Sequence, residues 1–323
     1  MGLSRKAKVL LNVFGVLVTL AALYLINRNF DIRSVAAGIG EFDPAIFGGV
    51  VLIYLSTFTF RTIRWLLMLP KANTVTFKST LYAIIIGFGG NNLLPGRLGE
   101  LLRMEHIKAQ TGLNRITVLG SIGMEKVLDA LILFGILMFC LNGLESASGT
   151  LVNLSFWLML ALALITAGIV LFRIYHQKVL NYFEASGSTK KYARLLASLI
   201  ARLAEALVFL RFDKKTLFVL ITSLIIWLIE GIVFVLVMKQ VSGDMPILTG
   251  FLTLAIVNFS ILIPSSPGYI GVFQAATVFS YSLFQLPKEE GLEAGIIIHA
   301  AQFLPTTLIA LIIGGKFLLK KRK

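Results

Sequence analysis

Uninterrupted apolar runs recur along the whole chain, and their length constrains the fold more than any other feature. Six of these runs lie at residues 9–26, 46–69, 115–141, 151–175, 216–238 and 291–319. A helix of about 20 apolar residues crosses the hydrocarbon core of a bilayer. Only 14% of the 323 residues are charged, whereas soluble domains carry about 25%. The sequence therefore predicts an all-α polytopic membrane protein that forms a single integral membrane domain.

Two further apolar regions, 79–111 and 246–286, are interrupted by proline and glycine. Proline lacks a backbone N–H, and glycine ends helices at little cost. At membrane depth, the backbone groups that a break releases must be satisfied by protein or by a water-filled cavity. We therefore expect two re-entrant segments and six to eight transmembrane helices, depending on whether 246–286 forms a hairpin or crosses twice.

The cationic residues predict the orientation of the chain. The connection 173–215 carries nine Lys or Arg, the tail from Lys316 carries five and the N-terminus carries three, but 142–150 carries none. Cytoplasmic connections hold the excess of Lys and Arg in membrane proteins. Both termini and 173–215 are therefore expected in the cytoplasm, with the chain in a prokaryotic cell (inner) membrane.

This orientation indicates an inverted repeat, because 79–111 then enters and leaves from the cytoplasmic side and 246–286 from the outer side. The chain divides into a first span with an outer loop (1–45), a first repeat (46–141), a connecting span with an amphipathic helix (142–215) and a second repeat (216–323). That amphipathic helix, at 190–211, suits either the membrane interface or a cytosolic position on the bundle. Inverted repeats place substrate sites near the midplane, at broken helices.

The first broken segment has the composition of an anion site. A half-helix that begins near Gly96, after Pro95, would direct its free N–H groups and positive dipole end at the break. Arg97 and Arg103 add fixed positive charge, and arginine suits bidentate contact with phosphate. The alternative is that Arg97, Glu100 and Arg103 form ion pairs on a helix surface at the cytoplasmic interface.

Acidic residues inside apolar spans are the second candidate feature. Glu125 and Asp129 share a helix face, where two carboxylates in lipid need a cation or a proton. Glu230 lies deep inside another span and is expected to face the bundle interior. Arg61 and Arg64 either pair with Glu230 or extend to the cytoplasmic surface, and the second arrangement is favoured.

Other features exclude several classes of function. The chain lacks metal-ligand spacing, a phosphate loop, a dinucleotide fingerprint and a nucleophile triad. A single cysteine, Cys140, excludes a disulfide within the chain. The net charge of +14 lies in connections between spans and not on a base-stacking face, so no nucleic acid partner is expected. The sequence therefore predicts neither a cofactor nor a metal, no catalytic residues, and a protein that is not an enzyme.

Three motifs together resemble a known family. They are Asn92-Leu93-Leu94-Pro95-Gly96-Arg97-Leu98-Gly99-Glu100-Leu101-Leu102-Arg103, Glu125-Lys126-Val127-Leu128-Asp129 and Pro264-Ser265-Ser266-Pro267-Gly268-Tyr269-Ile270-Gly271. This set is similar to the transmembrane region of lysylphosphatidylglycerol synthases, and the likeness extends from about residue 10 to 315. In the full synthases this region precedes an aminoacyl-transferase domain. This sequence stops at Lys323, before such a domain would begin. The resemblance therefore implies lipid translocation without lipid synthesis.

The leading hypothesis is a flippase that moves a phospholipid or another polar-headed lipid between leaflets. The alternatives are a secondary transporter of a small anion, a non-catalytic subunit of a lipid-modifying membrane complex and, as a lesser option, a membrane transferase with Glu125 or Asp129 as base. The expected partners are membrane phospholipids, with a second copy of the chain or a lipid-modifying enzyme as further options. The predicted substrate-binding residues are Asn92, Pro95, Gly96, Arg97, Glu100, Arg103, Glu125, Asp129, Glu230, Asn258, Pro264, Pro267, Gly268 and His299.

Overall fold

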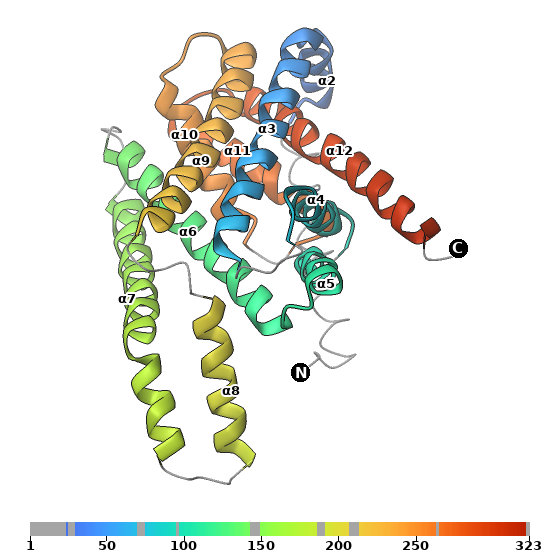
Figure 1. The fold of residues 1–323 in the computed structure, drawn as a ribbon. Coiled ribbons are helices and arrows are strands. Elements are labelled where there is room, and N and C mark those ends of the chain that lie inside the picture. Colours follow the sequence, from blue (N-terminus) through green and yellow to red (C-terminus); the bar gives the residue numbers. More distant parts are fainter. Residues whose placement is uncertain are drawn as a thin grey trace.

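The structure is a computed structural model that describes residues 24, 30–69, 75–94, 97–142, 149–185, 191–206, 213–262 and 265–320. Throughout these residues the regular secondary structure is helical, which confirms the predicted all-α class (Figure 1). The predicted span 9–26 lies outside the described residues except for Tyr24, and so do Pro95, Gly96 and Pro264.

Long helices form the frame of the bundle, and they match five predicted spans. They are α3 (Pro44–Met68), α6 (Arg115–Asn142), α7 (Gly149–Ala185), α9 (Lys214–Ser242) and α12 (Lys288–Lys320). Four described stretches are long and apolar enough to cross a membrane: Pro44–Met68, Ala163–Tyr182, Lys214–Ser242 and Lys288–Gly314. Helix α6 is equally long but carries charged residues at its centre. The membrane-protein class is thus confirmed, whereas the total number of spans stays a prediction.

Capping residues explain where the long helices begin. The Asp43 side chain accepts a hydrogen bond from the Ala45 N–H, and Pro44 occupies the first helical position of α3. Asp213 accepts from the Thr216 N–H at the start of α9. A side-chain acceptor at this position satisfies one of the free N–H groups of the first turn. Each capping residue therefore determines where its helix begins.

Two helices occupy the segments between the spans. Helix α2 (Ile32–Glu41) lies within the predicted outer loop and begins at Asp31, whose side chain accepts from the Arg33 N–H. Helix α8 (Lys191–Ala206) falls within the predicted amphipathic segment. In Figure 1, α8 and the adjoining half of α7 project together from the rest of the bundle. Its position, at the membrane interface or on the cytosolic side of the bundle, stays a prediction.

The first broken segment folds as two short helices, α4 (Phe77–Leu93) and α5 (Gly99–Thr111), packed side by side. Their contact depends on glycine. A Cβ on Gly99 would overlap the Gly87 carbonyl oxygen, and a Cβ on Gly90 would lie 2.8 Å from Gly99 Cα. Backbones can approach this closely only without side chains. This close contact explains why both helices of the pair carry glycine where they meet.

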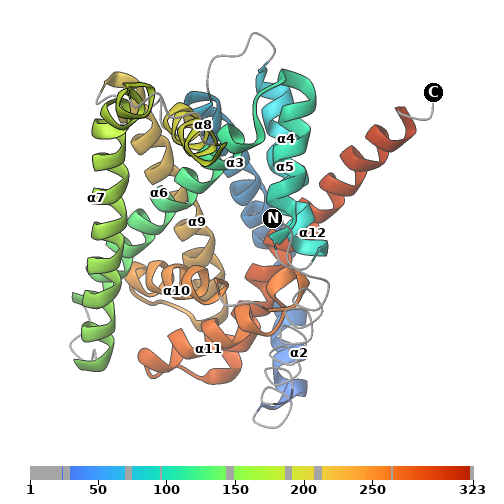
Figure 2. The same ribbon diagram turned by 90° about the horizontal axis from the view of Figure 1, so that it is seen from below.

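The second broken segment comprises α10 (Ile247–Ser260), a short 3₁₀ turn at Pro267–Tyr269 and α11 (Val272–Leu283). In Figure 2 the α4–α5 pair and the α10–α11 pair lie toward opposite ends of the bundle. Their breaks meet, because a Cβ added at Gly268 would lie 3.3 Å from the Asn92 carbonyl oxygen. This arrangement is the one that an inverted repeat requires, although re-entry into a membrane from opposite sides stays a prediction.

Candidate functional site

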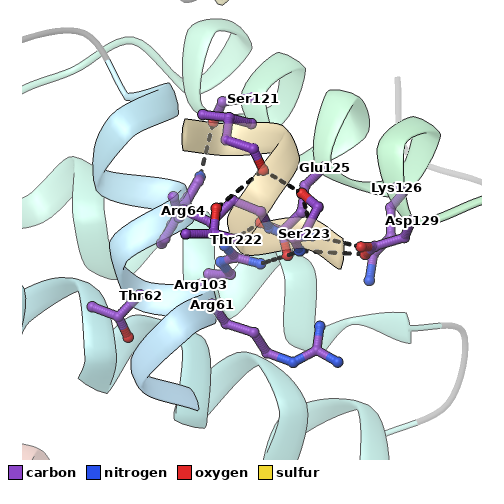
Figure 3. A network of polar contacts seen from close by, with 12 residues as sticks. Arg61, Thr62, Arg64, Arg103, Ser121, Glu125, Lys126, Asp129, Thr222 and Ser223 are labelled. Carbon is purple, nitrogen blue, oxygen red and sulfur yellow. Dashed lines mark hydrogen bonds and ion pairs between the residues drawn. The ribbon is translucent and has the colours of Figure 1, made fainter. Parts of the chain in front are cut away.

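Buried charged residues form a network at the centre of the bundle (Figure 3). Arg64 of α3 lies between the two carboxylates of α6, with Nη1 2.6 Å from Asp129 Oδ1 and Nη2 2.9 Å from Glu125 Oε1. The Trp227 indole N–H of α9 donates to Asp129 at 3.0 Å. Glu125 and Asp129 face the same way because they are one helical turn apart. The network thus joins α3, α6 and α9.

Arg103 of α5 adds a fourth helix to this network. Its guanidinium makes two hydrogen bonds to Glu125, at 2.7 and 3.2 Å, and lies 3.6 Å from the centre of the Trp65 ring. Only 2% of Arg103 is exposed. A guanidinium held by a carboxylate and an aromatic face has its charge compensated within the protein. Arg103 is therefore a structural element of the bundle and does not line the cavity described below.

Arg61 and Glu230 form a second buried ion pair, which joins α3 to α9. The prediction that Arg61 and Arg64 extend to the cytoplasmic surface is wrong, because 4% and 0% of these residues are exposed. Burying a charge in an apolar environment is costly unless a partner compensates it. The carboxylates of α6 and α9 supply those partners, so both arginines turn inward. The expectation that Glu230 faces the bundle interior is confirmed, and its pairing with Arg61 is the arrangement that was considered but not favoured.

A cavity of about 220 Å³ lies beside this network, between the two broken segments. It is bounded by residues from α3, α4, α5, α6, α9, α10, α11 and α12 and from the breaks themselves. The charged residues that line it are Arg61, Arg97, Glu100, Lys126, Asp129 and Glu230. The cavity is smaller than the roughly 300–1,000 Å³ of pockets for drug-sized ligands. Its size suits a small polar group.

Arg97 differs from the other cations of this cavity. The three described carboxylates of the cavity are already paired. Glu230 pairs with Arg61, and Asp129 pairs with Arg64, which does not line the cavity. Glu100 lies 3.9 Å from Lys126 Nζ. Among the described residues no carboxylate lies within ion-pair distance of Arg97. The cavity therefore has one cation whose charge the described side chains leave uncompensated.

Arg97 is held in place by the second broken segment. Its Nη2 donates to the Ile261 carbonyl oxygen at 2.8 Å, and its guanidinium lies 5.8 Å from the centre of the Tyr269 ring. Arg97 and Tyr269 have φ angles of 57° and 60°. Residues with side chains seldom adopt this left-handed conformation, and it recurs at functional sites. The two breaks thus contribute one unusual residue each, and the two residues touch.

Neutral polar side chains complete the wall of the cavity. Asn91, Asn92, Asn258, His299 and Gln302 all line it. Asn92 donates to Thr307 at 2.9 Å and Asn258 donates to the Leu254 carbonyl oxygen at 2.9 Å, so each keeps its amide oxygen as an acceptor. His299 stacks on Phe273 with ring centres 4.6 Å apart. The wall therefore offers hydrogen-bonding groups without further charge.

Exposed apolar side chains surround the breaks. Leu93 and Leu98 flank the first break, Leu262 lines the cavity at the second, and Ile270 follows it. Between 41% and 58% of each of these residues is exposed. Exposed leucine and isoleucine at the margin of a polar cavity are compatible with lipid chains and unfavourable next to water.

The structure brings together half of the predicted binding residues. Asn92, Arg97, Glu100, Asp129, Glu230, Asn258 and His299 line the cavity. Arg103, Glu125, Pro267 and Gly268 do not, because the first two are paired behind the wall and the last two form the turn at the second break. Pro95, Gly96 and Pro264 lie outside the described residues. Direct contact of any of these residues with a ligand stays a prediction.

Several lining residues were missing from the predicted set. Tyr54 lies two helical turns before Arg61 on α3, so the buried arginine could have indicated it. Asn91 precedes Asn92, yet it also caps α5 by accepting from the Gly99 N–H at 2.9 Å. Phe88 gives no polar signal in the sequence. Its position becomes evident only when α4 packs against α3.

Comparison of the sequence with curated proteins corrects one expectation. The protein named Glycosyltransferase AglD from Haloferax volcanii is 26% identical, over 94% of this chain and 53% of that protein. This chain thus spans about half the length of that relative. The expectation that the chain is not an enzyme is contradicted, because a protein that matches nearly all of it is named as a transferase. The sequence lacks a phosphate loop, a dinucleotide fingerprint and a nucleophile triad, so no motif indicated a transferase.

No solved structure matches the chain. The family described as the lysylphosphatidylglycerol synthase TM region matches residues 12–310, which confirms the likeness found in the three motifs. These motifs supply Arg97 and Glu100 to the cavity and Glu125 and Arg103 to the network behind it. The chain therefore belongs to the lysylphosphatidylglycerol synthase transmembrane-region family.

Proposed function

We propose that this protein binds the phosphate of a membrane lipid headgroup at Arg97 and carries that headgroup between leaflets. The observation that carries the proposal is the uncompensated charge of Arg97 in a cavity where each described carboxylate already has a cationic partner. An anion that enters would neutralise this charge. A guanidinium presents several parallel N–H groups to phosphate oxygens, so it suits phosphate better than a point charge does.

The surroundings of the cavity favour a lipid over a small water-soluble anion. The apolar side chains at the breaks would contact acyl chains, while the cavity of about 220 Å³ takes only the headgroup. A transporter of a soluble anion would instead need a polar path to water at the same place.

A translocation assay tests this proposal directly. Purified protein in liposomes, with a fluorescent phosphatidylglycerol and a membrane-impermeant quencher, reports the rate at which lipid changes leaflet. Arg97→Gln is expected to lower that rate by at least ten-fold, because it removes a charge-assisted phosphate contact worth about 1.5–3 kcal/mol. Arg115→Gln is the matched control, since Arg115 forms an exposed pair with Glu105 and does not line the cavity. Full activity of Arg97→Gln would contradict the proposal.

A second candidate function is a transferase that acts on a lipid-linked sugar, which the name of the relative favours. In such a reaction an acceptor hydroxyl forms a bond to the sugar carbon, the bond from that carbon to the lipid phosphate breaks, and the phosphate leaves with the electron pair. Arg97 would stabilise the leaving phosphate. Glu100 would take the hydroxyl proton, because its side chain is 29% exposed, the most accessible of the three cavity carboxylates.

This candidate has its own test. Purified protein is incubated with a lipid phosphate that bears a radiolabelled hexose and with a soluble sugar acceptor. Transfer of label that is lost in Glu100→Gln would support a transferase. Lipid movement without transfer of label would favour translocation alone.

A further inference from the structure

We infer that the headgroup taken by this cavity carries, beyond its phosphate, a neutral ring with several hydroxyl groups, such as a hexose or a cyclitol. This inference rests on the proposed phosphate site at Arg97 and names the substrate class of that site. It depends on which polar groups of the wall are already paired, on the aromatic residues beside them and on the size of the cavity.

Two of the three described carboxylates of the cavity are held by buried arginines. Glu230 is held by Arg61, and Asp129 is held by Arg64 at 2.6 Å and by the Trp227 N–H at 3.0 Å. An amine that paired with either carboxylate would displace an arginine, and that arginine would lose its partner at considerable cost. A neutral headgroup avoids this cost.

The uncommitted polar groups of the cavity are amides. Gln302 makes no side-chain hydrogen bond within the described part of the chain, and the amide oxygens of Asn92 and Asn258 accept none there. An amide pairs well with a hydroxyl group, which both donates and accepts. Three such groups on α4, α10 and α12 surround one space. They would contact hydroxyl groups on different edges of one ring.

Aromatic side chains provide the apolar part of this wall. Phe88, Tyr269 and Phe303 line the cavity together with the amides, and none of the three is fully buried. The C–H face of a sugar or cyclitol ring is apolar and packs against aromatic carbons. Sites of mixed aromatic and directed polar groups hold a ligand in one orientation. Arg61 already lies over the Phe88 ring at 5.0 Å and Arg97 over the Tyr269 ring at 5.8 Å, so a ligand ring would pack chiefly against Phe303.

The size of the cavity is compatible with such a headgroup. Its volume of about 220 Å³ leaves room for a six-membered ring beside the phosphate.

The test compares four lipids with the same acyl chains, namely phosphatidic acid, phosphatidylethanolamine, phosphatidylglycerol and phosphatidylinositol. Binding of each lipid to the purified protein is measured by native mass spectrometry with the lipid titrated in. Phosphatidylinositol, whose headgroup is one hydroxylated ring, is expected to bind at least five-fold more tightly than phosphatidic acid or phosphatidylethanolamine. Gln302→Leu should weaken phosphatidylinositol binding by about two- to ten-fold, the effect of one lost hydrogen bond, and leave phosphatidic acid binding unchanged.

Asn258→Leu provides a second variant with the same expectation, in case Gln302→Leu fails to fold. Equal binding of phosphatidic acid and phosphatidylinositol to wild type would overturn the ring inference and leave the phosphate site intact. Tighter binding of phosphatidylethanolamine would also overturn it. If Arg97→Gln binds all four lipids as tightly as wild type does, the proposed function is overturned instead. The two failures are therefore distinguishable.

Discussion

The Arg97 guanidinium donates a hydrogen bond to the Ile261 carbonyl oxygen at 2.8 Å, across 164 residues of sequence. This bond joins the break between α4 and α5 to the break after α10, and it forms one wall of the cavity. A carbonyl oxygen that accepts only one hydrogen bond from a cation does not neutralise it. Arg97 therefore both connects the two halves of the bundle and remains able to bind an anion.

Removal of the Glu230 carboxylate should increase anion binding. In Glu230→Gln, Arg61 loses its ion-pair partner and becomes a second uncompensated cation in the cavity. Phosphatidic acid is expected to bind several-fold more tightly to this variant, while its melting temperature falls because a buried arginine lacks its partner. Lipid titration and thermal unfolding in detergent measure the two effects. Weaker binding by Glu230→Gln would show that Glu230 itself contacts the ligand.

Loss of Arg103 should destabilise the protein more than loss of an exposed arginine. Arg103→Met leaves Glu125 with Arg64 as its remaining arginine partner and removes the guanidinium from the Trp65 ring. Breaking a buried pair costs about 3–5 kcal/mol, whereas an exposed pair contributes about 0–1 kcal/mol. Arg115→Met is the control, since about half of the Arg115 and Glu105 side chains is exposed. Equal melting temperatures of the two variants would refute a structural role for Arg103.

Gly99→Ala should disrupt the contact between α4 and α5. The added Cβ would overlap the Gly87 carbonyl oxygen and lie 2.7 Å from Asn91 Oδ1. We expect a loss of several °C in melting temperature, because overpacking costs about 1–3 kcal/mol. Gly135→Ala is the matched control: its Cβ meets no atom within 4 Å, and alanine is the better helix former. A neutral Gly99→Ala would mean that the two helices are not held this closely.

Cysteine labelling tests the opposite orientation of the two broken segments. The single native cysteine, Cys140, is buried, so wild type should not react with a membrane-impermeant maleimide. Ala109 at the end of α5 and Gln285 after α11 are both exposed. In intact cells Gln285→Cys should be labelled, and Ala109→Cys should be labelled only after the cells are opened. Labelling of both positions from outside would rule out the predicted inverted arrangement.

Much of the fold could be predicted because apolar length and helix breakers act locally. The five matched spans follow from runs of apolar residues, and the α4–α5 pair follows from the Pro95-Gly96 break. Helix α2 was missed within the outer loop because its signal is a single capping residue, Asp31.

The site was predicted less well, because pairing between helices depends on packing. The sequence places Arg97 and Arg103 together, but they are six residues apart, and one faces the cavity while the other faces Glu125. Arg61 and Arg64 were expected at the surface because the positions of their carboxylate partners on α6 and α9 depend on how those helices pack against α3. Residue types thus identified the charged groups, whereas only the structure separates the paired groups from the unpaired one.

Native mass spectrometry of the purified protein with its lipids retained tests the central claim most directly, with wild type beside Arg97→Gln and Arg115→Gln. The account predicts that one class of anionic lipid stays bound to wild type and to Arg115→Gln and is lost from Arg97→Gln. The same unselective lipids on all three proteins would contradict a phosphate site at Arg97.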